Sequence, residues 1–388
     1  MYQKNIRLLK IFNFLIGFSL FAPLAIIYFS KVSGSYTLGA SIFGITMLSS
    51  AVFEVPTGIW SDRVGRRGTI ILGSWARVLA FILYAIGLSY WWLVAGAILE
   101  GLSRSFYSGN NDAFLHDTLA DDGLEDEFDE HLGKASSPEH LALGMSGLIG
   151  GFVATYSFSY TMWLSVVSQI LLLVVSYLFI EPRTKRLINP NIFVHLKTAL
   201  LLFISNHKLR LLSLASIMRF SIGELKFLFR GAFVNLFWPL WGIGVLNVVS
   251  NFGASASYHF SGKIIKKYNA LKVLMFQTIE GKIIGLLAYG LPTVFSPALL
   301  VVPSLMHGVG SVAERKLLQQ EFSESSRATM SSLNSLLGSG AFFLMSLLLG
   351  GLADSIGPSY AMLIMTVLEL PVIYLYYLLF KNDRKIKA

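Results

Sequence analysis

The sequence predicts an all-α membrane protein with twelve transmembrane helices in two parallel six-helix repeats and both termini in the cytoplasm. Three observations predict this fold: the composition, the spacing of the apolar segments and an internal repeat. Of the 388 residues, 54% are hydrophobic and 14% are charged, whereas soluble domains carry about 25% charged residues. The chain has no cysteine, which excludes disulfides, thiolate metal sites and cysteine nucleophiles.

The spacing of apolar segments gives the number of spans, because about 20 apolar residues are needed to cross a bilayer as a helix. The N-terminal apolar run is longer than that of a signal peptide and is followed by a poor cleavage site, so we expect it to be retained as the first span. We place the twelve spans at 8–30, 37–60, 68–88, 91–116, 140–158, 160–181, 210–231, 238–260, 270–291, 295–314, 327–351 and 358–380.

The distribution of Lys and Arg sets the orientation, because loops rich in these residues stay in the cytoplasm. Twenty-four of the 31 Lys and Arg residues fall on the side that holds both termini, and the opposite side has only Lys31. Both termini are therefore predicted to be cytoplasmic. We attribute the net charge of +9 to this topology and not to nucleic-acid binding.

An internal repeat divides the chain into two halves. At an offset of 200 residues, segments 145–178 and 345–378 share 11 identities in 34 positions. A fainter match pairs Arg-Leu-Leu at 7–9 with the same residues at 210–212. Parallel repeats of this kind place a substrate site at the interface between the halves.

The repeat and the span pattern together predict the domain organisation. We expect an N-terminal six-helix bundle at 1–181 and a C-terminal six-helix bundle at 210–388. Between them, residues 182–209 are predicted to form a cytoplasmic linker with an amphipathic helix on the membrane surface.

One charged turn interrupts the apolar pattern between the second and third spans. It reads GIWSDRVGRR at 58–67 and contains Gly58, Asp62, Arg63, Gly65, Arg66 and Arg67. Cytoplasmic topology explains the arginines, but it does not explain the acid with glycines on both sides. With this turn, the whole chain resembles the major facilitator superfamily, whose motif at this place reads roughly G-x-x-x-D-[RK]-x-G-[RK]-[RK].

Two further segments extend the resemblance. Arg104 in the fourth span is followed by Gly109, similar to the superfamily's span-4 arginine and nearby glycine with one extra residue between them. The fifth span has Gly147 where the antiporter pattern has proline, and keeps the glycine pair at 150–151. The complete charged turn and Arg104 resemble the drug-type proton antiporter-like subgroup.

The resemblance implies that the 58–67 loop holds the cytoplasmic face shut in one state of the transport cycle. Asp62 can accept bonds from Arg63 or from the positive end of a helix, and Gly58 would allow a close helix approach. We expect the arginines at 66 and 67 to reach acids at the cytoplasmic end of the fourth span. The loop then comprises Gly58, Asp62, Arg63, Gly65, Arg66 and Arg67, with Asp112 and Asp117 as partners. The alternative is that the arginines only anchor the topology.

Ionisable groups inside spans are functional candidates, because each costs about 2.5–3.5 kcal/mol to insert. Glu54 is expected to pair with Arg77 at similar depth. Glu100 and Arg104 lie four residues apart on one helical face, which suits either ion coupling and substrate contact or a static salt bridge. The predicted coupling or substrate cavity contains Glu54, Glu100, Arg104, Arg219, Glu224 and His307.

The seventh span carries a basic face. Arg219, Lys226 and Arg230 are spaced by seven and four residues, so they share one side of a helix. Such a face would favour an anionic or zwitterionic substrate. The alternative is that Lys226 and Arg230 extend to the outer membrane interface. For Glu280 and Lys282 in the ninth span, and for Glu369 in the twelfth, structural pairing with partners that the sequence does not identify is the expectation.

We therefore expect a secondary active transporter that moves a small organic solute by alternating access, with proton-coupled efflux favoured. A nutrient or metabolite importer, a symporter of the same fold, is the alternative. His116 and Asp121 match the H-x4-D pattern of a membrane-bound lipid acyltransferase, but no other enzyme motif accompanies them, so an enzyme is not expected.

The expected partners follow from this interpretation. They are a small-molecule substrate and membrane lipids, with no nucleic acid. No cofactor or metal is expected, and the proton gradient is the expected driving force. We expect a monomeric, multi-pass protein in a bacterial inner (plasma) membrane.

Overall fold

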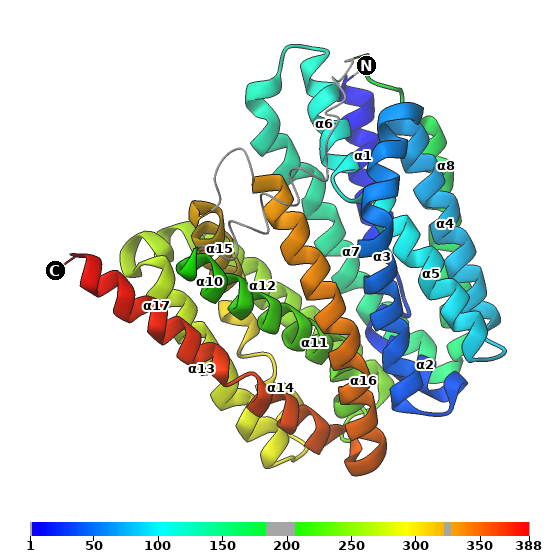
Figure 1. The fold of residues 1–388 in the computed structure, drawn as a ribbon. Helices are drawn as coiled ribbons and strands as arrows, with labels where there is room; N and C mark the ends of the chain where they lie inside the picture. The colour runs from blue at the N-terminus through cyan, green and yellow to red at the C-terminus, as the bar shows by residue number, and fades with distance from the viewer. Residues whose placement is uncertain (1, 184–205, 322–326, 388) are drawn as a thin grey trace. The chain divides into compact units, whose positions relative to one another are not determined.

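The computed structural model describes residues 2–183, 206–321 and 327–387, and within these ranges every regular element is a helix (Figure 1). The chain divides into two compact units. The first is Met1–Ile188 with Pro239–Val248, and the second is Asn189–Trp238 with Val249–Ala388. Most of the predicted linker, including its surface helix, lies outside the described residues, and the predicted domain boundaries stay a prediction.

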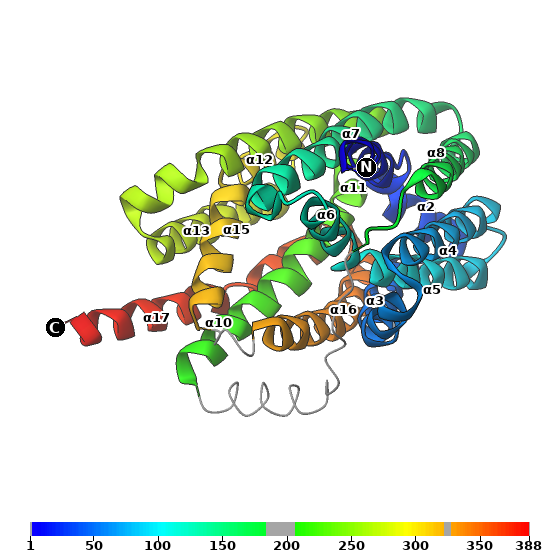
Figure 2. The same cartoon turned by 90° about the horizontal axis from the view of Figure 1, so that it is seen from above.

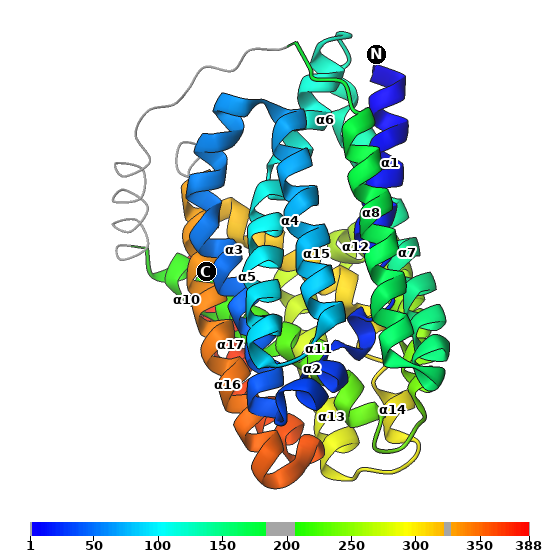
Figure 3. The same ribbon diagram turned by 90° about the vertical axis from the view of Figure 1, so that its right-hand side faces the viewer.

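The first unit holds the helices of the first six predicted spans. Figure 3 shows α3, α4, α5 and α8 running side by side, with α5 packed against both α3 and α4. The elements are α1 (Tyr2–Gly17), η1 (Ala22–Leu24), α2 (Ala25–Ser33), α3 (Tyr36–Val64), α4 (Arg66–Ile86), α5 (Tyr90–Tyr107), α6 (Asn110–Ala120), η2 (Glu125–Glu127), α7 (Phe128–Tyr156) and α8 (Phe158–Leu178).

The second unit holds most of the remaining elements, although α12 begins in the first unit. Its α13 packs against α15 and α16, and Figure 2 shows α15 beside α13. The elements are α10 (His207–Met218), the π-helical η3 (Arg219–Glu224), α11 (Leu225–Val234), α12 (Leu240–Tyr268), α13 (Ala270–Gly290), α14 (Ser296–Leu299), α15 (Ser304–Glu321), α16 (Arg327–Leu368) and α17 (Pro371–Lys387). Gly357, at φ +82°, interrupts α16 between the predicted eleventh and twelfth spans.

The helix α8 shows the polarity expected in a bilayer, with polar side chains inside and apolar ones outside. Its buried polar residues are Thr161, Ser165, Ser168, Gln169 and Ser176. Its exposed apolar residues recur at helical spacing and are Trp163, Leu164, Val167, Ile170, Leu171 and Val174. Lipid is the solvent that tolerates this outer face, so the pattern supports a membrane location for α8.

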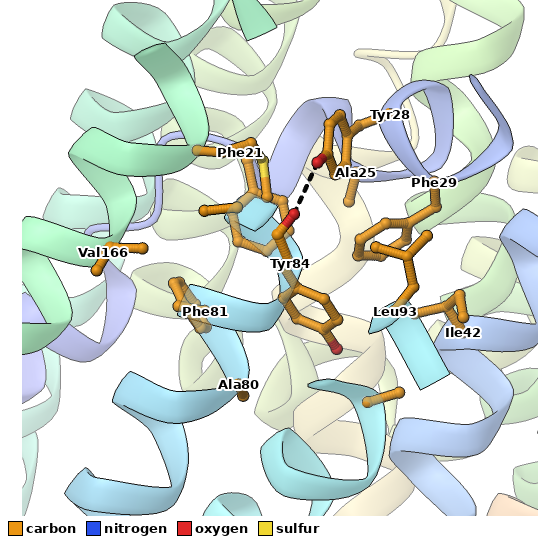
Figure 4. Packing of buried hydrophobic residues seen from close by; sticks show 13 residues of the cluster. Phe21, Ala25, Tyr28, Phe29, Ile42, Ala80, Phe81, Tyr84, Leu93 and Val166 are labelled. Carbon is orange, nitrogen blue, oxygen red and sulfur yellow. Dashed lines mark hydrogen bonds between the residues drawn. The ribbon is translucent and has the colours of Figure 1, made fainter. Parts of the chain in front are cut away.

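A cluster of buried aromatic and aliphatic side chains packs helices of the first unit together (Figure 4). The Tyr28 hydroxyl donates a hydrogen bond to the backbone carbonyl of Tyr84 at 2.7 Å. Phe21 meets Phe81 edge to face, with ring centroids 5.2 Å apart. Lipid tails are as apolar as these side chains, so moving the side chains from lipid into the protein does not by itself hold helices together. Close packing and hydrogen bonds between helices do so instead.

Six helical stretches among the described residues are long and apolar enough to cross a membrane. One of them covers 49 residues, which is ample for two crossings, and another covers 31. They are Gln3–Ser33, Tyr36–Glu54, Arg66–Ile86, Phe158–Leu178, Ser296–Leu318 and Leu333–Lys381. These stretches establish a multi-pass membrane protein, while the count of twelve spans and the location of the termini stay predictions.

The first predicted span is not one continuous helix. It separates into α1 and α2, with η1 between them. Pro23 explains part of the break, because proline has no backbone N–H and its ring clashes with the preceding turn. Four side chains take up carbonyls released near the end of α1: Arg77 at Ile16, Gln169 at Leu15, Ser146 at Gly17 and Ser168 at Phe18.

Four other predicted spans are also irregular. Gly109, at φ +67°, separates α5 from α6 in the fourth span. The seventh span contains the π-helical η3. Residues 300–303, ending in a proline, separate α14 from α15 in the tenth, and residues 369–370 separate α16 from α17 in the twelfth, just before Pro371. The apolar pattern shows where a helix crosses the membrane, but it does not register these interruptions.

Candidate functional site

The charged turn at 58–67 lies where α3 ends and α4 begins. Arg66, the first residue of α4, places its Nε 3.2 Å from Asp117 Oδ2, and the two side chains are 12% and 4% exposed. Its Nη1 donates a hydrogen bond to Ser61 Oγ at 2.8 Å. The structure thus forms the predicted contact between this loop and the acid at 117, as a nearly buried ion pair.

Asn110 joins this ion pair to the break in the fourth span. The Ser61 hydroxyl donates to Asn110 Oδ1 at 2.8 Å, and Asn110 Nδ2 donates to the Arg66 carbonyl at 3.1 Å. Asn110 is the first residue of α6, directly after Gly109 in its left-handed conformation. The glycine after Arg104, noted in the sequence, therefore starts the short helix that carries both Asn110 and Asp117.

Glu181 is a site residue that the sequence did not indicate. Its two carboxylate oxygens accept the backbone N–H groups of Arg66 and Arg67, at 2.6 and 2.7 Å. A carboxylate at this position satisfies N–H groups that have no partner inside the helix and lies at the positive end of the helix dipole. Glu181 is 114 residues or more from these partners in sequence, so no local motif could have revealed it.

Gly65 makes this cap possible. Its backbone has φ +89° and ψ 167°, and a Cβ there would lie 2.7 Å from Glu181 Oε1. By contrast, a Cβ built on Gly58 meets no heavy atom within 4 Å among the described residues. The close helix approach expected at Gly58 is therefore not present there, and Gly65 is the glycine of the motif that a side chain would disturb.

The remaining predicted loop residues divide into three groups. Arg67 Nη2 donates to the Tyr177 carbonyl at 3.0 Å, so it contacts α8 and not an acid of the fourth span. Arg63 and Asp112 are exposed, and the described contacts give Asp112 no ion pair. The side chain of Asp62 lies outside what the structure describes, so its part in the loop stays a prediction.

A second charged group lies within the first unit, on α5. Arg104 donates to Glu100 Oε1 through Nε at 3.1 Å and through Nη2 at 2.9 Å, and the Tyr84 hydroxyl donates to Glu100 Oε2 at 2.9 Å. Glu100 is 12% exposed and Arg104 is 45% exposed. The carboxylate is thus enclosed by donors, while the guanidinium is open on one side.

Arg77 does not form the predicted pair with Glu54. Its Nε donates to Gln169 Oε1 at 2.7 Å, and its Nη2 donates to the Ile16 carbonyl at 2.9 Å. The guanidinium also lies over the Phe81 ring, 5.0 Å from its centroid. The interrupted α1 offers carbonyls to this buried cation, which explains why it needs no carboxylate.

The second unit contains its own buried charges. Arg219 Nη1 lies 3.4 Å from Glu314 Oε2, and Lys226 Nζ lies 2.9 Å from Glu369 Oε2. Lys282 Nζ approaches the same oxygen of Glu369 at 2.5 Å. Structural pairing was expected for Glu280, Lys282 and Glu369. Lys282 and Glu369 pair with each other, whereas the buried carboxylate oxygens of Glu280 have no hydrogen-bond partner among the described residues.

Lys226 and Arg230 are both enclosed within the second unit and have partners there. Lys226 is 14% exposed and pairs with Glu369. Arg230 is 8% exposed, donates to Ser250 Oγ at 3.1 Å and lies over the Phe227 ring. Buried partners on α12 and at the α16–α17 break hold both cations inside the unit.

Glu224 and His307 are the remaining two residues of the predicted cavity. Glu224 ends the π-helical η3. His307 is exposed on α15, and its ring meets Tyr258 edge to face with centroids 6.1 Å apart. A functional role for either residue stays a prediction.

The arrangement defines a class of protein. Helical units with ion pairs inside apolar spans, and a charged turn bounded by glycine, are typical of a membrane transporter. The family model described as Major Facilitator Superfamily matches residues 8–313. The chain therefore belongs to the Major Facilitator Superfamily and is a multi-pass membrane protein.

Characterised and uncharacterised relatives match parts of the chain. An uncharacterized transporter, BU466 of Buchnera aphidicola, is 25% identical over 194 residues, which are 50% of this chain and 48% of that protein. The inner membrane transport protein YajR of Escherichia coli is 31% identical over 88 residues, which are 22% of this chain and 19% of that protein. The chain thus matches about half or less of the length of these relatives.

Solved structures share the fold over nearly the whole chain. The nucleoside transporter NupG superposes with a TM-score of 0.82 at 14% identity, covering 97% of this chain and 99% of that one. A bacterial homologue of the human lysosomal transporter Spinster gives a TM-score of 0.73 at 15% identity, covering 96% and 95%. At these identities the similarity establishes the fold and leaves the solute open.

Proposed function

We propose that the protein couples proton movement to the export of a small organic solute across a bacterial cytoplasmic membrane by alternating access. In this proposal, twelve spans cross the membrane, and both termini and the 58–67 loop lie in the cytoplasm. The observation that carries the proposal is the group formed by Glu100, Arg104 and Tyr84 inside the fourth span. The excess of Lys and Arg on one side supports the orientation.

Protonation of Glu100 would change what Arg104 can do. The carboxylate now accepts two hydrogen bonds from Arg104, and charge-assisted bonds of this kind are about twice as strong as neutral ones. A neutral Glu100 would lose most of that attraction and release the guanidinium. Because a half-exposed arginine inside a span has to face water or another protein group and not lipid, Arg104 is placed to meet a solute.

The first experiment measures proton flux with purified protein in liposomes that contain a pH-sensitive dye. A panel of drugs and metabolites is added under an imposed pH gradient. The wild-type protein is expected to move protons when a transported solute is present. Glu100→Gln removes the titrating group while keeping its shape, so solute exchange without a gradient is expected to persist and coupled proton flux to disappear.

The matched control is Glu130→Gln. Glu130 is an exposed carboxylate on α7 whose side chain pairs with Lys134, and it lies outside the predicted spans. Its removal should leave coupled flux at the wild-type level. Coupled flux that survives in Glu100→Gln would refute the coupling role. Solute accumulation on the side that receives the protons would indicate symport and would replace export with import.

The 58–67 loop supplies the second part of the proposal, closure of the cytoplasmic face. Its ion pair between Arg66 and Asp117 is nearly buried, and we infer that Asp62 adds an interaction that forms only when this face is closed. Cysteines introduced at Lys134 and Lys267 can carry spin labels, because the chain has no native cysteine. Asp62→Asn is expected to shift the measured distance distribution toward longer separations, and an unchanged distribution would contradict the gating role.

A further inference from the structure

Glu369 lies at an interruption of the twelfth predicted span and meets two lysines. It occupies the two-residue gap between α16 and α17 and is 4% exposed. The ammonium groups of Lys226 and Lys282 both contact its Oε2, at 2.9 and 2.5 Å. Two cations from different helices therefore share one oxygen of one carboxylate.

The charges of this region do not balance. Together with the neighbouring ion pair of Arg219 and Glu314, this cluster contains three cations and two carboxylates among the described residues. Arg219 Nη1 and Glu314 Oε1 are buried, yet neither has a hydrogen-bond partner there. An uncompensated buried charge is costly, so a group with one net positive charge favours an additional anion.

The local backbone leaves space beside Glu369. The segment η3, which starts at Arg219, is π-helical, a geometry found mostly as short bulges and frequently at functional sites. Within η3, Gly223 faces the second carboxylate oxygen: a Cβ there would have only Glu369 Oε1 within 4 Å, at 3.8 Å. The backbone therefore approaches the carboxylate without a side chain between them.

The internal repeat has a neutral side chain at the position that matches Glu369. At the 200-residue offset, Glu369 corresponds to Gln169. In the first unit, the neutral Gln169 and the Ile16 carbonyl are sufficient partners for the buried Arg77. The second unit has a glutamate and two lysines in place of the glutamine and the arginine. It therefore carries more buried charged groups at this position than the first unit does.

We propose that Lys226, Lys282 and Arg219 form a binding site for the oxyanion group of a solute, a carboxylate or a phosphate, and that Glu369 occupies this site when the solute is absent. The proposal rests on the transport function proposed above and names the class of solute. When an oxyanion enters, it replaces Glu369 as the partner of one lysine, and Glu369 stays paired with the other lysine. Glu369 is thus an internal competitor, and its removal should have the opposite effect on binding from removal of a lysine.

The test measures binding of acetate and of inorganic phosphate to the purified full-length protein in detergent. Tryptophan fluorescence is followed at constant ionic strength, with chloride as the reference anion. The wild-type protein should bind at least one of the two oxyanions, and the stronger one identifies carboxylate or phosphate as the preferred group. Lys282→Gln should raise its dissociation constant about tenfold or more, since a charged hydrogen bond is lost. Glu369→Gln should lower it.

Two controls separate this site from a purely structural ion cluster. Lys263→Gln removes the same charge from an exposed position on α12 and should leave the dissociation constant unchanged. Lys282→Arg keeps the positive charge and should restore binding, even if Lys282→Gln is less stable. Because no proton gradient is present, oxyanion binding can be observed even if coupled transport is not.

Three results would overturn the proposal. The first is no saturable oxyanion binding by the wild-type protein. The second is an equal dissociation constant for Lys282→Gln and the wild type. The third is weaker binding in Glu369→Gln, because a structural partner, unlike a competitor, would support the site.

Discussion

Two features of the structure require glycine at position 65: its backbone conformation and the space that its missing side chain leaves. Its φ of +89° with ψ of 167° is a backbone conformation that is essentially restricted to glycine. Its missing side chain also leaves room for the Glu181 carboxylate that caps α4. Gly65 therefore allows the start of α4 to be capped. The capping residue, Glu181, comes more than 100 residues later in the sequence.

We predict that Gly65→Ala lowers the free energy of unfolding by about 1–3 kcal/mol, the cost of this backbone conformation for a residue with a Cβ. Gly58→Ala is the matched control, since Gly58 lies in α3 with open space around it. It should be neutral or stabilising by up to about 1 kcal/mol, because alanine favours a helix interior. Thermal unfolding in detergent measures both, and equal effects would contradict the distinction.

The capping carboxylate itself gives a second prediction at this scale. Glu181→Gln keeps one acceptor oxygen but loses the negative charge at the positive end of α4. We expect a loss of about 0.5–2 kcal/mol, the range found for helix caps. Hydrogen exchange at the amides of Arg66 and Arg67 should accelerate, whereas amides in the middle of α4 should not. Unchanged exchange at these two amides would show that the cap is dispensable.

At the scale of elements, the ion pair of Arg66 and Asp117 joins α4 to α6. Removing one partner leaves the other charge buried, so each single substitution, Arg66→Gln or Asp117→Asn, should destabilise the protein. The double variant should lose less than the two single losses combined, with a coupling energy of about 0.5–3 kcal/mol. The exposed pair of Glu130 and Lys134 provides the control cycle, which should show no measurable coupling.

The sequence predicted the elements better than their interruptions. Apolar runs located the helices of the first unit, although α7 begins at Phe128, twelve residues before the predicted span at 140–158. Gly109 was noted in the sequence for its place after Arg104. The pair of Glu54 and Arg77 was wrong because the sequence does not show that α1 stops at Gly17 and exposes carbonyls nearby. Glu181 was missed for a similar reason, since its partners are set by tertiary packing.

The fainter match of Arg-Leu-Leu at 7–9 with 210–212 aligns two helix interruptions. Its offset of 203 residues places Ile16 opposite Arg219. The first helix α1 ends at Gly17, and the π-helical η3 begins at Arg219, so both copies depart from the α-helix at corresponding positions. Interrupted helices at matching places in two repeats indicate a binding region in transporters.

At the scale of the whole molecule, the predicted orientation can be tested on intact cells. Leu88, at the predicted outer end of the third span, is 76% exposed, and Asp122 is exposed in a predicted cytoplasmic segment. Each is replaced by cysteine in turn, as Leu88→Cys and Asp122→Cys. The absence of native cysteine makes each introduced thiol unique. A membrane-impermeant maleimide should label the first in intact cells and the second only after permeabilisation, and the reverse pattern would contradict the orientation.

The correspondence of Gln169 and Glu369 also has a genetic consequence. Codons for glutamine and glutamate differ at a single nucleotide, so the two halves are one point mutation apart at this position. A single substitution after a tandem duplication is therefore sufficient to give a neutral residue at this position in one half and a charged residue in the other. Gln169 bonds to Arg77, and Glu369 bonds to Lys226 and Lys282; the same ancestral position now stabilises one half and gives the other an exchangeable charge.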